Sequence, residues 1–99
     1  MAKKIIWTPQ AEETFEGILN YLEINWTEKE KRNFIVATDK IIQLISKQPD
    51  LFRKSNSLNT YEALVTKHNL LLYIVKKDTV DLITFWDTRR NPKKKHKNK

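Results

Sequence analysis

The chain has 99 residues, of which 39% are hydrophobic and 31% charged, and its formal net charge is +7; this size fits one small domain. It contains no cysteine, which excludes disulfide frameworks, cysteine-based zinc sites and thiol catalysis. Its two histidines lie in lysine-rich surroundings, so we expect neither a metal site nor a cofactor. The apolar run at residues 70–75 is too short to cross a bilayer, and residues 1–9 lack the apolar stretch of a secretory signal. We therefore expect a cytoplasmic protein.

The positive charge is concentrated at one end of the chain. Residues 1–88 carry 12 basic and 12 acidic residues, whereas residues 89–99 carry seven basic residues and no acidic one. We expect a single domain over residues 1–92 and a basic tail over residues 93–99. Such a tail is drawn to phosphates or to an acidic partner.

The first predicted elements are a strand over residues 3–7 and a helix that follows it. Thr8 is suited to cap this helix, and Pro9 suits the first helical position. Apolar residues then recur at helical spacing: Ala11, Phe15, Ile18, Leu19, Leu22 and Trp26. Gly17 falls opposite this apolar stripe, where it serves no core contact and costs about 1 kcal/mol of helix stability relative to alanine.

A second helix is predicted directly after the first. Residues 27–30 fit the capping-box pattern, in which the Thr27 side chain bonds forward and the Glu30 side chain reaches back. Apolar residues between Phe34 and Ile45 cover about half of the helix circumference, and Pro49 stops the helix. The two helices form an antiparallel hairpin.

Three strands follow a predicted loop over residues 50–60. The apolar pattern changes to a period of two over residues 61–66, 70–76 and 80–86, with turns between these segments. The predicted class is α+β with the order β-α-α-β-β-β, in which a small curved antiparallel sheet carries the helical hairpin on one face.

The last two strands are apolar on both faces, whereas an antiparallel sheet covered on one side should alternate cleanly. The second face is covered by a partner chain, by the tail or by another copy of this chain, unless the sheet curls enough to bury both faces itself. A partner is expected to contact Leu71, Tyr73, Val75, Ile83 and Phe85.

Five short segments occur in a characteristic order: residues 6–11 (IWTPQA), 18–22 (ILNYL), 41–45 (IIQLI), 71–75 (LLYIV) and 82–92 (LITFWDTRRNP). Together they resemble the RelE/ParE superfamily of bacterial type II toxin–antitoxin toxins over nearly the whole chain. The resemblance implies a curved sheet backed by a helical hairpin, and an antitoxin that wraps the toxin and covers its active surface.

The superfamily has two activities, and the resemblance bears on both. RelE-like members cut mRNA in the ribosomal A site without a metal, using strand lysines, a strand arginine and groups beyond the last strand; ParE-like members poison DNA gyrase. In this chain, Tyr61 and Ala63 stand where RelE-like members have the strand lysines, and Leu70 stands where they have the strand arginine. Only Arg89 or Arg90 therefore matches a catalytic cation.

Other residues could supply the chemistry of RNA cleavage or phosphate binding. Lys67 and His68 share a predicted turn, and histidine can transfer protons near neutral pH. A basic patch that faces phosphate is the other candidate site, and its residues are Arg53, Lys54, Lys93, Lys94 and Lys95.

The sequence therefore predicts a ParE-like toxin that inhibits gyrase by binding and is neutralised by a cognate antitoxin. One alternative is a RelE-like, metal-independent and ribosome-dependent mRNA endoribonuclease that uses Arg89, Arg90, Lys67 and His68. Another is a non-toxic, basic nucleic-acid-binding module. A homodimer and a toxin–antitoxin heterotetramer are both open as assemblies.

Overall fold

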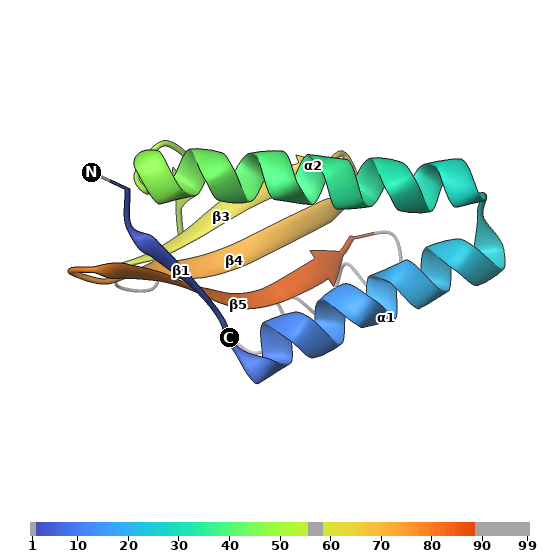
Figure 1. The fold of residues 1–99 in the computed structure, drawn as a ribbon, viewed down its shortest axis with the longest axis horizontal. Coiled ribbons are helices and arrows are strands. Elements are labelled where there is room, and N and C mark those ends of the chain that lie inside the picture. Colours follow the sequence, from blue (N-terminus) through green and yellow to red (C-terminus); the bar gives the residue numbers. More distant parts are fainter. Residues whose placement is uncertain (1, 56–58, 89–99) are drawn as a thin grey trace.

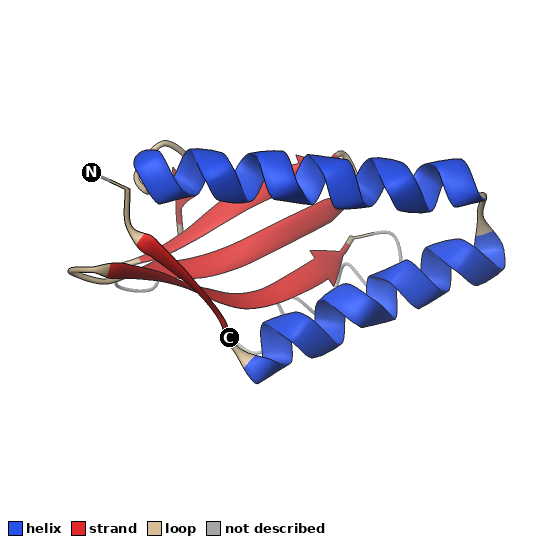
Figure 2. Ribbon diagram, viewed as in Figure 1, coloured by secondary structure: helices blue, strands red, loops and turns tan. Residues whose placement is uncertain are grey.

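A computed structural model of the chain describes residues 2–55 and 59–88. It has two layers, in which a hairpin of helices lies on one face of a five-stranded sheet (Figures 1 and 2). The elements in chain order are β1 (Lys4–Trp7), α1 (Pro9–Asn25), α2 (Glu28–Lys47), β2 (Arg53–Lys54), β3 (Thr60–Thr66), β4 (Asn69–Val75) and β5 (Thr79–Asp87). The predicted α+β class, with both helices on the same face of the sheet, is confirmed.

The strands lie side by side in the order β1-β5-β4-β3-β2. β3, β4 and β5 form the predicted antiparallel meander. β1 runs parallel to its neighbour β5, which is possible because the long helical hairpin carries the chain across the sheet before the meander begins. The sheet is therefore mixed rather than wholly antiparallel.

The segment over residues 50–60, predicted as a loop, contains the short edge strand β2. Arg53 pairs with Glu62 and Lys54 with Tyr61 in an antiparallel arrangement. This strand was not predicted because two consecutive basic residues give no alternating apolar pattern, whereas strand pairing depends on backbone groups and the neighbouring strand.

α1 begins where the sequence predicts. Oγ1 of Thr8 accepts a hydrogen bond from the N–H of Ala11 at 3.1 Å, and Pro9 is the first helical residue. The Thr8 hydroxyl also donates to the carbonyl of Leu82 in β5 at 2.7 Å. One side chain thus caps the helix and ties its start to the sheet.

Half of the predicted capping box forms at the start of α2. Oγ1 of Thr27 accepts a hydrogen bond from the N–H of Glu30 at 3.2 Å. The predicted return bond from the Glu30 carboxylate to Thr27 is absent among the described residues; the Glu30 side chain instead lines a cavity between the helices and the sheet. α2 ends at Lys47, just before Pro49.

The core lies between the helical hairpin and the sheet, around an aromatic cluster. The ring centroid of Phe15 in α1 lies 5.3 Å from each of those of Trp7, Phe34 and Phe85, distances at which aromatic pairs attract. The buried apolar side chains around this cluster include Ala11, Ile18, Leu22, Ile45, Ala63, Leu71, Tyr73, Val80 and Leu82. Gly17 has nothing within 4 Å of the position of a Cβ, so it makes no close helix contact.

Candidate functional site

The face of the sheet opposite the helices carries apolar side chains on β3, β4 and β5, and its polar residues Thr60, Glu62 and Asp81 lie beside them. Successive side chains of a strand point to opposite faces; Leu71 of β4 is fully buried in the core, so Leu70 and Leu72 point away from the helices. The strand register aligns Leu64, Leu70 and Trp86 in one row across the three strands. We call this surface the open face, and its apolar side chains are Leu64, Leu70, Leu72, Ile74, Ile83 and Trp86.

Side chains of the open face are accessible to solvent to different degrees. Leu64 is 54% exposed, whereas Leu70, Leu72, Ile74 and the two β5 residues are partly buried. Apolar side chains gathered on one face of a sheet are typical of an interaction site.

Two local features of β5 shape the open face. The pairing with β4 shifts from Leu72–Thr84 to Tyr73–Leu82, which leaves Ile83 as the extra residue of a β-bulge, a feature that re-aims side chains. The indole N–H of Trp86 is buried and has no acceptor among the described residues. An unpaired buried donor of this kind costs free energy.

The sequence assigned the partner-binding residues to the wrong face of the sheet. Leu71, Tyr73 and Phe85 are at most 3% exposed and belong to the core, and Val75 packs against it. They are buried because the apolar sides of α1 and α2 cover this face of β4 and β5. Among the five predicted contact residues, Ile83 is the one that lies on the open face.

The positions that correspond to RelE-like lysines hold packed side chains. The ring of Tyr61 stacks on that of Tyr73, with centroids 5.6 Å apart, and Ala63 is fully buried. The Tyr73 hydroxyl donates to the carbonyl of Pro49 at 2.7 Å, and burial raises the pKa of this phenol far above its ordinary value. These side chains stabilise the fold and present no cation to a substrate.

Of the predicted basic patch, the structure describes Arg53 and Lys54. Arg53 and Lys54 are exposed neighbours in β2, and consecutive strand residues point to opposite faces. The other predicted members, Lys93, Lys94 and Lys95, lie outside the described residues, as do Arg89 and Arg90.

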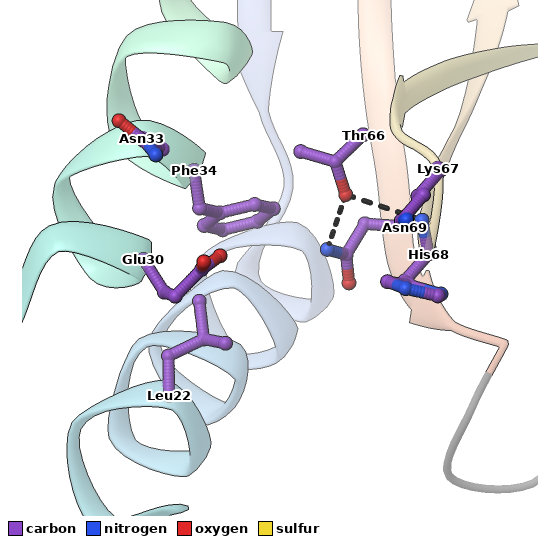
Figure 3. A pocket seen from close by; sticks show the side chains of 8 residues that line it. All are labelled: Leu22, Glu30, Asn33, Phe34, Thr66, Lys67, His68 and Asn69. Atoms are coloured by element: carbon purple, nitrogen blue, oxygen red, sulfur yellow. Dashed lines mark hydrogen bonds between the residues drawn. The ribbon is translucent and has the colours of Figure 1, made fainter. Parts of the chain in front are cut away.

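Lys67 and His68 occupy the β3–β4 turn, as predicted, and line a cavity of about 110 Å³. Figure 3 shows the turn facing the first residues of α2, so that the cavity lies between the helical hairpin and the sheet. Its other lining residues are Leu22, Glu30, Asn33, Phe34, Thr66 and Asn69. The sequence did not predict this cavity, because it arises where the start of α2 meets a turn more than thirty residues later in the chain.

The described residues contain no cluster of three or more histidine, cysteine or acidic side chains that could hold a metal ion. Neither described helix combines the length and hydropathy needed to span a membrane.

Comparison with known proteins identifies the family. The sequence profile described as "ParE toxin of type II toxin-antitoxin system, parDE" matches residues 5–92. The chain belongs to the ParE toxin family. It is thus a member of the RelE/ParE superfamily of type II toxin–antitoxin toxins, as the sequence predicted. A search of curated proteins finds no match to this ParE-family chain.

Solved structures with the same fold include several toxins. A chain of the chromosomal ParDE toxin–antitoxin system from P. aeruginosa has 9% identity and a TM-score of 0.73, covering 87% of this chain and 96% of its own. The YoeB/ParE toxin from Agrobacterium tumefaciens has 13% identity and a TM-score of 0.62, and the match covers 85% of this chain and 96% of the toxin. A chain of the heterotetrameric YoeB–YefM toxin–antitoxin complex from Staphylococcus aureus has 19% identity and a TM-score of 0.56, covering 85% and 94%.

Proposed function

We propose that this ParE-family chain inhibits DNA gyrase by binding it, and that a cognate antitoxin neutralises it by covering the same surface. The observation that carries the proposal is the open face. It presents apolar side chains on a sheet whose Tyr61, Ala63 and Leu70 offer no cations at the positions where RelE-like members carry catalytic cations. Inhibition by binding needs a complementary surface and no bond-making residues.

The open face has the chemistry of a surface that is covered in a complex. Leu64, on the β3 side of this face, is 54% exposed, and burying apolar surface is the main driving force of association. The buried indole N–H of Trp86, which has no acceptor among the described residues, lies in the same row. The basic tail over residues 93–99 supports the encounter with an acidic antitoxin, because complementary charge raises association rates more than affinity.

A supercoiling assay with purified gyrase tests this proposal. The full chain should inhibit supercoiling, and Leu64→Glu should weaken the inhibition by at least about tenfold, because a charge is placed in the apolar contact. Val36→Glu is the matched control: Val36 is 57% exposed on α2, far from the open face, and it undergoes the same kind of change. No inhibition at a large molar excess, or equal effects of the two variants, would contradict the proposal.

The same preparations distinguish gyrase inhibition from RNA cleavage. In a translation extract the message should stay intact when the wild-type chain is added. Cleavage in the ribosomal A site that is lost in Arg90→Ala would instead assign the RelE-like activity to this chain.

A further inference from the structure

The cavity beneath the helical hairpin contains a buried acceptor that no described residue satisfies. Asn69 is 3% exposed, and its side-chain N–H group donates to Oγ1 of Thr66 at 2.8 Å. Its amide oxygen Oδ1 has no donor among the described residues. Figure 3 shows this oxygen turned away from Thr66, into the space between the helices and the turn.

A second acceptor faces the same space from the opposite wall. The carboxylate of Glu30 points from α2 toward Asn69 (Figure 3). No described residue donates a hydrogen bond or forms an ion pair with this carboxylate. The remaining walls include the buried ring of Phe34 and the imidazole of His68.

We infer that this cavity binds a guanidinium group, such as the end of an arginine side chain of a partner protein. A guanidinium carries five N–H donors in a rigid planar fork, so one group can donate both to Oδ1 of Asn69 and to the carboxylate of Glu30. Its flat face suits contact with the ring of Phe34, since cations are attracted to aromatic faces. The volume of about 110 Å³ holds several water molecules or the end of one long side chain.

The charges around the cavity favour a cation over a phosphate. The carboxylate of Glu30 and the amide oxygen of Asn69, on opposite walls of the cavity, both repel an anion. Lys67 is exposed, and a long lysine side chain can keep its ammonium group in water. This inference does not depend on whether gyrase is the target of the toxin.

Titration of the ¹⁵N-labelled full chain with N-acetyl-arginine amide, followed by NMR, tests the inference. The side-chain amide signals of Asn69 and the backbone signals of His68 and Phe34 should shift in a saturable way. N-acetyl-citrulline amide, the neutral analogue with the same shape, should bind about tenfold more weakly, because its contact with Glu30 is not charge-assisted. A titration with agmatine, a free guanidine, identifies the source of the guanidinium group. Tighter binding of the blocked arginine indicates an arginine of a protein, and tighter binding of agmatine indicates a free guanidine.

Two variants in the first turn of α2 provide the control. Glu30→Gln should weaken binding of the arginine probe by about tenfold. Glu28 is also an exposed acidic residue of the same turn, and Glu28→Gln should leave the binding unchanged. Both variants remove one charge near the helix N-terminus, so a general electrostatic effect would be equal in the two. Equal effects, equal binding of citrulline and arginine, or absence of shifts at Asn69 would overturn the inference and leave a cavity that holds only water.

Discussion

The hydroxyl of Thr14 in α1 accepts a hydrogen bond from the backbone N–H of Phe85 in β5, at 3.0 Å. β1 pairs with β5 only as far as Leu82, so beyond that point this edge of β5 has no strand neighbour in the described part of the chain. The proton of the Thr14 hydroxyl is directed to the carbonyl of Gln10, at 2.9 Å, which leaves its oxygen free to accept. A helix side chain thus completes the edge of the sheet.

Replacing Thr14 with valine should therefore destabilise the fold. Valine keeps the shape of threonine but removes the acceptor, and an unsatisfied buried N–H costs about 1–3 kcal/mol. Urea denaturation of the purified chain measures this loss. Thr14→Ser keeps the hydroxyl and should recover most of the stability; if serine and valine unfold at the same urea concentration, the hydrogen bond to Phe85 contributes nothing.

Gly17→Ala should have the opposite effect. The position lies within α1, and an added Cβ meets no atom within 4 Å, so the substitution brings no clash. Alanine is favoured over glycine in a helix by about 1 kcal/mol, and it also restricts the unfolded chain. The free energy of unfolding should rise by up to this amount in the same urea assay, and a decrease would mean that a partner element packs against Gly17.

A pair of leucine substitutions tests which face of the sheet the helices cover. Leu71→Ala should cost about 2–5 kcal/mol, because it leaves a cavity in the core. Leu64→Ala removes the same atoms from a side chain that is 54% exposed and should cost less than about 1 kcal/mol. Comparable losses in the two variants would show that the free chain buries both faces.

This contrast also shows what the sequence could and could not predict. Thr8, Pro9 and Thr27 act through neighbours three residues away or less, so the helix starts were predicted. β4 is apolar on both faces, so the sequence pattern does not show whether Leu71 or Leu72 faces the helices. Contact with the helices, which the pattern does not contain, decides between the two.

The cavity around Asn69 depends on long-range geometry in the same way. Its walls come from α1, α2 and the β3–β4 turn, and no local pattern relates Glu30 to Asn69. The turn itself was predicted from residues 67–69, but the unpaired oxygen of Asn69 is visible only once the helices are placed above it.

The raised pKa of Tyr73 predicts how stability depends on alkaline pH. Burial is the main cause of the shift, and it favours the neutral phenol in the folded chain. The stabilisation is therefore complete below the ordinary tyrosine pKa of about 10 and is lost as the pH rises above it, because the unfolded chain ionises first. Tyr73→Phe should unfold more easily at pH 8, having lost the hydrogen bond to Pro49, but its stability should fall less steeply above pH 10. If the free energy of unfolding, measured by urea denaturation, falls equally steeply above pH 10 in the two proteins, the prediction is contradicted.

Asp81 predicts a complementary dependence on acidic pH. The hydrogen bond from Lys76, with Nζ 2.9 Å from Oδ2 of Asp81, is the main cause that lowers the pKa of this carboxyl, and the Thr79 hydroxyl adds a second bond. A carboxyl with a lowered folded-state pKa stabilises the fold at pH values above its ordinary pKa of about 3.9. This contribution is lost as the pH falls through the lower, folded-state pKa.

Asp81→Asn should therefore be less stable than the wild type at pH 7, and the difference should shrink below about pH 4. Asp78→Asn, which removes a charge from an exposed residue three positions earlier, should keep the acid dependence of the wild type. If the difference between Asp81→Asn and the wild type is constant from pH 7 to pH 3, the pairing with Lys76 does not stabilise the charged carboxylate.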